Sequence, residues 1–191
     1  MGTSTDPVPG GGQVRTLGSR IVYRNPWIEV REDRIRRADG STGIYGVVHR
    51  SDFAVIVPLD GDRLHLVEQF RYPRGERCWE FPAGGLPEGQ SATSVEMAHR
   101  ELREETGLRA GHLAHLGVID AAPATMTQRG HAYLATDLSA GEPEREHEEQ
   151  DMRSEWFDRT VVERMIRTGE ITDSQTIAAY GLLLLHERSG I

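Results

Sequence analysis

A glycine-rich loop that runs directly into a helical pattern constrains the fold of this sequence more than any other feature. The loop is Pro82-Ala-Gly-Gly85, and the helical pattern covers residues 93–106. Ser91 or Ser94 is a candidate N-cap, and Gly107 is the candidate stop signal of this helix. Because glycine carries no side chain, the backbone of the loop can approach a ligand closely. The pattern therefore predicts a ligand-binding loop that is followed at once by a helix.

Three glutamates lie on one face of the predicted helix. Glu101, Glu104 and Glu105 stand at i, i+3 and i+4, a spacing that puts their Cβ atoms about 5 to 6 Å apart. Glu96 and Arg100 fall on the outward side, and an apolar stripe that would pack on a sheet adjoins the acids: Val95, Ala98 and Leu102. Such a face is also typical of a solvated surface helix. Together with a loop carbonyl, however, clustered carboxylates suit Mg²⁺ or Mn²⁺ better than Zn²⁺.

The order of the other elements predicts a layered α/β domain behind a small separate sheet. Residues 1–13 are expected to be a disordered tail, and residues 14–52 a small antiparallel sheet with strands at 20–23, 27–34 and 43–48. The main domain, residues 53–191, begins with a hairpin of 54–59 and 64–70. The domain is completed by strands at 113–119, 132–135 and 155–157 and by helices at 161–167 and 174–187. Asp173 is the candidate cap of the last helix. Strands with helices on both sides favour an α/β/α arrangement.

Composition excludes several classes of protein. The net charge of -8 argues against general binding to a nucleic-acid backbone. All 22 basic residues are arginines, so a Schiff-base or P-loop lysine is ruled out. Cys78 is the only cysteine, which excludes an intramolecular disulfide. The longest apolar run, residues 178–185, is too short to span a bilayer, and no secretory signal is seen, so we expect a cytoplasmic protein without a membrane partner.

The residues from Arg100 to Leu108, RELREETGL, reproduce the second half of the Nudix box, G-x5-E-x7-R-E-U-x-E-E-x-G-U, in which U is a bulky aliphatic residue. The lead-in from Trp79 to Gly85, WEFPAGG, resembles that of the same family, the Nudix hydrolases. The first half departs from the pattern, because Gln90 replaces its glutamate and nine residues rather than seven separate this position from Arg100. This insertion puts in doubt how the loop closes over a phosphate and which substrates fit.

The resemblance extends over residues 20–185 and points to the subfamily that cleaves ADP-ribose and related nucleoside diphosphate sugars. Three further segments carry it: VYRNPWIEV at 22–30, VEQFRY at 67–72 and GEITDSQT at 169–176. It implies a Nudix-type α/β/α sandwich with a mixed β-sheet, preceded by the small N-terminal antiparallel β-sheet. That sheet is too small for a core of its own, so we expect a homodimer formed through it, as the subfamily's exchanged dimers imply.

By the same resemblance, the helix and the loop hold the metal. Glu101 and Glu105 are the expected direct ligands, Glu104 is a ligand or a bridging acid, and the Ala83 carbonyl is the backbone ligand. Arg100 is expected to orient the acids, so that it and Glu104 belong to the catalytic set. Mg²⁺ is the expected cofactor, with Mn²⁺ as the alternative. Metal is required in this interpretation because three clustered carboxylates would otherwise repel a diphosphate.

The resemblance also places the general base in a loop after the box. Glu148 is the first choice and Glu149 the second. The alternative interpretation is a solubilising surface run, since six of the eleven residues from Gly141 to Asp151 are acidic. A loop of this composition is suited to a base that moves into place once the substrate is bound.

Five residues are candidates for contact with the substrate. Arg71 can meet phosphate oxygens in bidentate fashion, although a surface ion pair is the alternative. Glu80 supports the loop or a water on the metal, and Gly84 and Gly85 let the backbone approach the phosphates. Trp27 is a candidate to stack on a base across a subunit boundary, although a lone aromatic is more often part of a core.

The expected reaction is the metal-dependent hydrolysis of a diphosphate bond in a small-molecule substrate. ADP-ribose, which gives AMP and ribose 5-phosphate, is the preferred substrate. GDP-mannose or another nucleoside diphosphate derivative is the alternative within the enzyme class, because a fold does not fix the base or the sugar. A non-catalytic nucleotide-sugar sensor is the alternative from another class. The retention of all three helix glutamates favours the enzyme.

Overall fold

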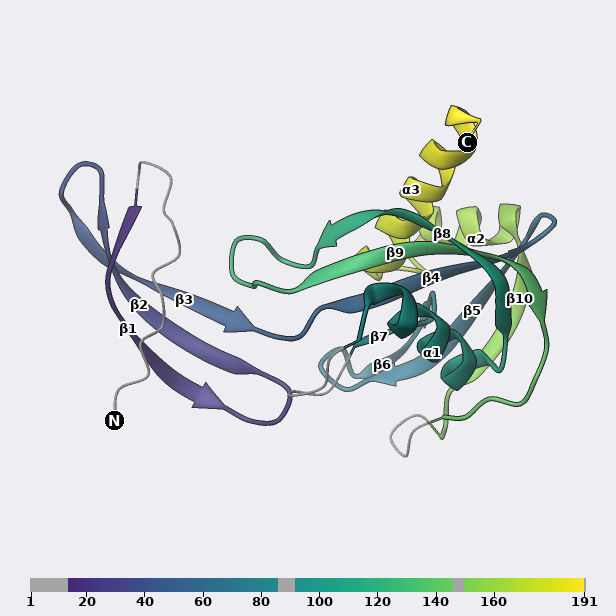
Figure 1. Ribbon diagram of the computed structural model, residues 1–191, viewed down its shortest axis with the longest axis horizontal. Coiled ribbons are helices and arrows are strands. Elements are labelled where there is room, and N and C mark those ends of the chain that lie inside the picture. The colour runs from purple at the N-terminus through teal and green to yellow at the C-terminus, as the bar shows by residue number, and fades with distance from the viewer. Residues whose placement is uncertain (1–13, 86–91, 146–149, 191) are drawn as a thin grey trace. The chain divides into compact units, whose positions relative to one another are not determined.

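A computed structural model describes residues 14–85, 92–145 and 150–190 of the chain. These residues form two compact units (Figure 1). The first consists of residues 14–51 and 122–128, and the second of residues 52–121 and 129–190. In the described part of the chain, no helix is long and apolar enough to cross a membrane.

The first unit is a three-stranded antiparallel sheet. Its strands are β1 (Val14–Arg24), β2 (Glu29–Arg37) and β3 (Thr42–His49), in the order β1-β2-β3. β1 and β3 extend beyond the predicted segments at both ends, whereas β2 begins two residues later than predicted and continues to Arg37. Pairing with a neighbour recruits polar residues that carry no hydrophobic signal. A loop segment of the same unit adds to β3, where Val48 N donates to Thr125 O at 2.8 Å and Thr127 N donates to Val48 O at 3.1 Å.

The second unit contains a seven-stranded mixed sheet. β4 and β9 are parallel, and the other pairs are antiparallel. Along the main path the order is β10 (Arg153–Asp158), β5 (Arg63–Arg71), β4 (Phe53–Asp60), β9 (Arg129–Ser139) and β8 (Arg109–Asp120). Two strands that the sequence did not predict pair off this path: β6 (Glu76–Glu80) with β5, and β7 (Ala83–Gly85) with β4.

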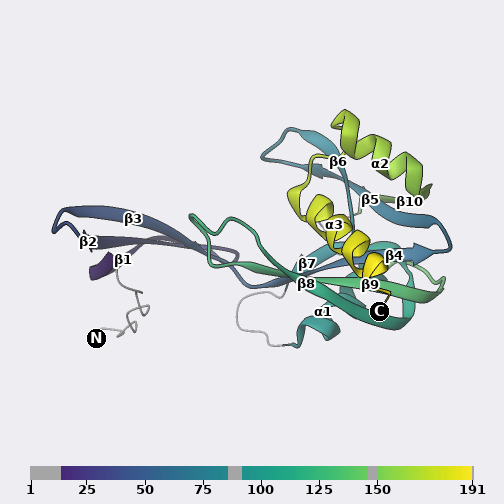
Figure 2. The same ribbon diagram turned by 90° about the horizontal axis from the view of Figure 1, so that it is seen from above.

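Helices cover both faces of this sheet. Helix α1 (Ser94–Thr106) lies on one face, and α2 (Arg159–Thr168) and α3 (Ser174–Ser189) lie on the other (Figures 1 and 2). Strand β4 alternates between the two layers: Ala54 and Ile56 pack with α1, whereas Val55 and Val57 pack with the core on the α2 and α3 side. The predicted α/β/α arrangement is therefore confirmed.

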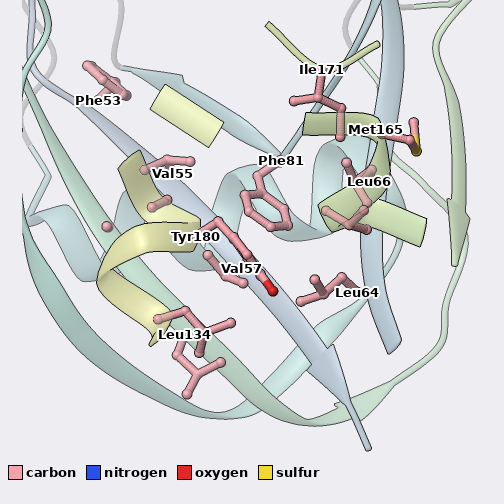
Figure 3. Close-up of a cluster of buried hydrophobic side chains, with 14 residues drawn as sticks. Phe53, Val55, Val57, Leu64, Leu66, Phe81, Leu134, Met165, Ile171 and Tyr180 are labelled. Atoms are coloured by element: carbon pink, nitrogen blue, oxygen red, sulfur yellow. The ribbon is translucent and has the colours of Figure 1, made fainter. Parts of the chain in front are cut away.

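The larger core anchors the start of the glycine-rich loop. Figure 3 shows Phe81 among Leu64, Leu66 and Tyr180, and the Phe81 side chain is only 1% exposed. Because Pro82 follows directly, the chain enters the loop from a fixed point. The Pro82 carbonyl also accepts a hydrogen bond of 2.9 Å from Ile56 N in the central strand β4.

Helix α1 begins and ends at residues that match local capping rules. Its N-cap is Thr93, not Ser91 or Ser94, because Thr93 and Glu96 form a reciprocal capping box. Gly107 ends the helix with a left-handed φ of 75°, as the sequence predicts.

The buried face of α1 differs from the predicted apolar stripe. Ala98 and Leu102 are buried as expected, but Val95 is 39% exposed and Met97 is buried instead. Glu101 and Glu105 also belong to this face, with exposed fractions of 6% and 1%. The face follows the helical spacing 98, 101, 102 and 105, so two carboxylates occupy positions that an amphipathic pattern assigns to apolar residues.

Candidate functional site

The glycine-rich strand β7 passes directly against α1. Its register with β4 places Gly84 opposite Ala54. A Cβ atom on Gly84 would lie 2.2 Å from Oε2 of Glu101, and one on Gly85 would lie 2.8 Å from the Asp52 carbonyl oxygen. No larger residue fits at either position without displacing its neighbour. The Glu101 carboxylate therefore lies on the backbone of the loop.

Glu105 contacts the same strand at Ala83, the residue before Gly84. Its Oε2 atom accepts a hydrogen bond of 3.1 Å from the backbone N of Ala83. Since the side chain is almost fully buried, this hydrogen bond compensates part of the cost of removing a carboxylate from water. Two of the three candidate metal ligands on α1 are thus in direct contact with the loop that supplies the backbone candidate, Ala83.

Arg100 joins the loop to the other two acids. Its Nη2 atom donates to the Gly85 carbonyl at 3.0 Å and also forms an ion pair with Glu101, while its Nε atom lies 3.4 Å from Glu104 Oε2. The side chain is therefore not turned outward as the helical spacing predicts. It bends over the acidic face because both its carbonyl partner and its carboxylate partners lie there.

The donor chemistry of this cluster fits a hard divalent cation. Two carboxylates are buried, the third is four-fifths buried, and a glycine-rich backbone lies beside them. Among residues 14–85, 92–145 and 150–190, no three acidic, histidine or cysteine side chains converge closely enough to form a ready metal cage. In the described arrangement the positive charge between Glu101 and Glu104 comes from Arg100. The carboxylate and carbonyl oxygens that a hard divalent cation prefers are therefore grouped around the glycine-rich loop.

Arg71 and Glu80 form a bidentate pair beside the acids. Arg71 Nε lies 2.9 and 3.1 Å from the two carboxylate oxygens of Glu80, which is buried at the end of β6. Burial by itself would lower the pKa of Arg71, but the hydrogen bonds and charge of Glu80, with Glu105 and Asp173 adding to them, raise it above its usual value. The Arg71 side chain is 42% exposed, so this charged residue is only partly covered next to the acidic face.

The N-terminal turn of α3 supports the loop from the other side, a role that sequence reasoning missed. The fully buried Thr176 accepts a hydrogen bond of 2.9 Å from Phe81 N through Oγ1. Asp173 caps the helix as predicted, since its Oδ2 atom accepts a hydrogen bond of 2.7 Å from Thr176 N. The only sequence signal was the resemblance of the GEITDSQT segment, which did not specify what the threonine contacts.

The remaining candidates from the sequence are Trp27, Glu148 and Glu149, together with Gln90 of the Nudix-like segment. Trp27 belongs to the first unit and is 70% exposed, so it is not a core aromatic within the described residues. Glu148, Glu149 and Gln90 lie outside the residues that the structure describes.

Comparisons with known families agree with this arrangement. The family model of the NUDIX domain matches residues 48–180. The model of the nucleoside diphosphate sugar hydrolase N-terminal domain matches residues 14–48. The two matches meet at residue 48, near the end of β3.

Individual relatives are similar over nearly the whole chain. An ADP-ribose pyrophosphatase of Mycobacterium tuberculosis is 35% identical over 173 residues, which cover 90% of this chain and 82% of that protein. An ADP-ribose pyrophosphatase of Bacillus subtilis is 27% identical and covers 91% of this chain and 94% of its own length. A crystal structure of an ADP compounds hydrolase has the same fold, with a TM-score of 0.83 at 19% identity over 96% of this chain and 98% of that one. The family model and the relative from Mycobacterium tuberculosis therefore show that the chain belongs to the Nudix family and is a Nudix hydrolase.

Proposed function

We propose that this enzyme hydrolyses the diphosphate bond of ADP-ribose in a reaction that depends on a divalent metal ion, and releases AMP and ribose 5-phosphate. One observation carries the proposal: the buried carboxylates of Glu101 and Glu105 lie against the backbone of a glycine-rich loop. The two relatives named ADP-ribose pyrophosphatase support the choice of substrate.

The acidic face of α1 and the loop would hold the metal ion. Glu101, Glu104 and Glu105 would supply carboxylate oxygens, and Ala83 its carbonyl oxygen, with Mg²⁺ as the expected ion and Mn²⁺ as the alternative. When bound there, the ion neutralises phosphate charge and lowers the pKa of a water molecule. The contact between Gly84 and Glu101 supports this assignment, because a residue without a side chain lets the carboxylate lie directly against the backbone of the loop that would meet the phosphates.

Arg71 and Arg100 would orient the substrate and the acids. Arg71 is held by Glu80, and its side chain is 42% exposed, so its guanidinium would be available to meet phosphate oxygens. Arg100 donates to Gly85 and pairs with Glu101, so it fixes the distance between the loop and the helix. Gly84 and Gly85 would present backbone to the diphosphate.

Glu148 would take a proton from the attacking water, with Glu149 as the second choice. The described residues that precede these acids support the assignment. Glu144 N donates to the Glu104 carbonyl at 3.0 Å, and Arg145 Nε donates to the Glu105 carbonyl at 3.2 Å. Residues 144 and 145, which precede the two acids, therefore lie next to the C-terminal turn of α1. That turn carries two of the proposed ligands.

The N-terminal region, residues 14–52, would form the interface of a homodimer. Its sheet leaves many apolar side chains at least 43% exposed: Val14, Leu17, Ile21, Val22, Tyr23, Trp27, Ile44 and Tyr45. A monomer rarely leaves this much apolar surface in contact with water. A second copy of the chain would cover it and could bring Trp27 to a nucleotide base.

A panel assay tests the proposed reaction. The purified full chain is incubated with ADP-ribose, GDP-mannose and other nucleoside diphosphate derivatives, with Mg²⁺ or with a chelator, and the products are identified. We expect AMP and ribose 5-phosphate only when metal is present. Faster cleavage of another derivative would reassign the substrate, and binding without cleavage of any derivative would identify a sensor. Glu170→Gln, which alters an exposed ion pair in the turn between α2 and α3, is the matched control for variants of the helix acids.

A further inference from the structure

The chain that precedes Glu148 and Glu149 packs tightly on the end of α1. A Cβ atom on Gly107, the C-cap of the helix, would lie 2.2 Å from the carbonyl oxygen of Gly141. A Cβ atom on Gly141 would in turn lie 3.1 Å from the carbonyl oxygen of Gly107. The two backbones therefore approach more closely than side chains would allow. This contact fixes the position from which residues 142–145 start.

The next residues bind carbonyl groups in the last turn of the same helix. The final four carbonyls of a helix lack partners within it, and those of Glu104 and Glu105 belong to this group. Glu144 N donates to Glu104 O, and Arg145 Nε donates to Glu105 O. A guanidinium is favoured there, since the C-terminal end of a helix is the negative end of its dipole.

Arg145 also contacts the chain that follows Glu148 and Glu149. Its Nη1 atom donates to the carbonyl of Met152, whose side chain is 2% exposed and therefore fixed in the interior. In the other direction, Gln150 Nε2 donates to the Arg145 carbonyl at 2.9 Å. Arg145 thus joins two parts of the chain: the last turn of α1 and residues 150–152.

We propose that Arg145 is a positioning residue for hydrolysis, which ties the chain on both sides of Glu148 and Glu149 to the C-terminal turn of the helix that carries Glu104 and Glu105. This inference rests on the proposed function. Arg145 needs no contact with the substrate for this role. It fixes residue 145, which precedes the proposed base, at the last turn of α1. A displacement of about 1 Å at a reacting group can reduce turnover about 100-fold.

The geometry requires a guanidinium and not merely a positive charge. The two carbonyls that Arg145 bridges are 47 residues apart in sequence, and they bind different nitrogens of one planar group. Lysine has a single nitrogen at the end of a flexible chain, so it would hold one carbonyl at a time. Arg145→Lys should therefore restore only part of what Arg145→Ala loses.

The test compares Arg145→Ala with Arg159→Ala in the full chain. Arg159, the first residue of α2, is a matched control because it also binds two partners, Asp62 and Glu187. Asp62 follows the end of β4, whereas the glycine-rich strand β7 pairs with the start of β4. We expect Arg145→Ala to lower kcat about 100-fold with KM changed less than about threefold. Arg159→Ala should lower the melting temperature and leave kcat within about threefold.

A double-variant cycle separates positioning from a general loss of structure. Glu148→Gln and Glu149→Gln are each combined with Arg145→Ala, and kcat is measured for every variant. If Arg145 acts through the base, the combination with the true base should be no slower than the slower single variant, within about threefold. If the fold-losses in kcat of the single variants multiply in both double variants, Arg145 acts independently of these acids. That result would overturn the proposal.

Hydrogen exchange gives a readout that does not depend on activity. In Arg145→Ala, amides of residues 141–153 and of the last turn of α1 should exchange faster than in the wild type, whereas Arg159→Ala should leave them unchanged. Unchanged exchange and an unchanged kcat would overturn the Arg145 proposal alone. A wild-type chain that cleaves no nucleoside diphosphate derivative would overturn the proposed function, and the positioning role with it.

Discussion

Thr176 Oγ1 accepts a hydrogen bond from the backbone N of Phe81, a residue 95 positions earlier in the chain. Both groups are buried, so neither can turn to water when the other is lost. This one contact holds the N-terminal turn of α3 against the entrance of the glycine-rich loop. The loop is thereby supported on the side opposite α1.

Thr176→Val should destabilise the protein, because valine has the shape of threonine but leaves the Phe81 N–H unsatisfied. We expect a loss of about 1 to 3 kcal/mol in the free energy of unfolding, measured by denaturant titration. Thr176→Ser retains the hydroxyl and should lose less. Equal losses for the two variants would mean that packing, and not the hydrogen bond, makes the contact important.

Gly84→Ala should impair catalysis by displacing the Glu101 carboxylate. The new methyl group would lie 2.2 Å from Oε2, and the carboxylate is buried with little room to move. We expect turnover to fall about 100-fold in a steady-state assay. Gly181→Ala is the control, because it lies inside α3 with nothing within 4 Å, and it should stabilise the fold by about 0.5 to 1 kcal/mol without changing turnover. Normal turnover in Gly84→Ala would argue against a role for Glu101.

Glu105→Gln should separate the charge of this side chain from its structural contact. The amide oxygen of glutamine can still accept the hydrogen bond from Ala83 N, so the fold should remain intact. The loss of negative charge should raise the Mg²⁺ concentration needed for half-maximal turnover at least about tenfold, since a neutral oxygen is a weaker ligand for a hard cation. A metal titration of turnover measures this shift. An unchanged midpoint would remove Glu105 from the set of proposed ligands.

His65 should make the fold sensitive to acid. It lies buried against Trp156, with ring centroids 4.7 Å apart, and burial lowers its pKa from 6.5 to about 4. Between these values the unfolded chain binds a proton that the folded chain does not, so stability should fall as the pH drops through this window, by up to about 3 kcal/mol. Unfolding curves of the wild type and His65→Phe at several pH values measure it. An equal dependence of the unfolding free energy on pH in the wild type and His65→Phe would contradict the assignment. His99→Gln, which changes an exposed histidine, is the control.

The sequence predicts what depends on local pattern, and it does so well for the helices. Gly107 and Asp173 were recognised as caps because capping depends on residues within one turn. Strands β6 and β7 were not predicted, because β7 has three residues, two of them glycine, and exists only through its pairing with β4. In physical terms, a short strand is stabilised by its partner and not by its own propensity.

The same division applies to the site. The spacing of Glu101, Glu104 and Glu105 could be recognised because it follows one helical turn. The spacing does not predict that the carboxylates of Glu101 and Glu105 are buried, since burial depends on where the sheet lies. The contact of Arg145 with Glu105 joins residues 40 positions apart, and no local pattern encodes it.

The central claim is that the carboxylates of α1 bind the metal ion that contacts the diphosphate. The most direct measurement is a crystal structure of the full chain with Mg²⁺ and a non-hydrolysable analogue of ADP-ribose. We predict oxygens of Glu101 and Glu105 at about 2.0 to 2.1 Å from Mg²⁺, with the diphosphate on the same ion. If the ion binds elsewhere, while Glu101 stays paired with Arg100 and Glu105 with Ala83, the account is wrong.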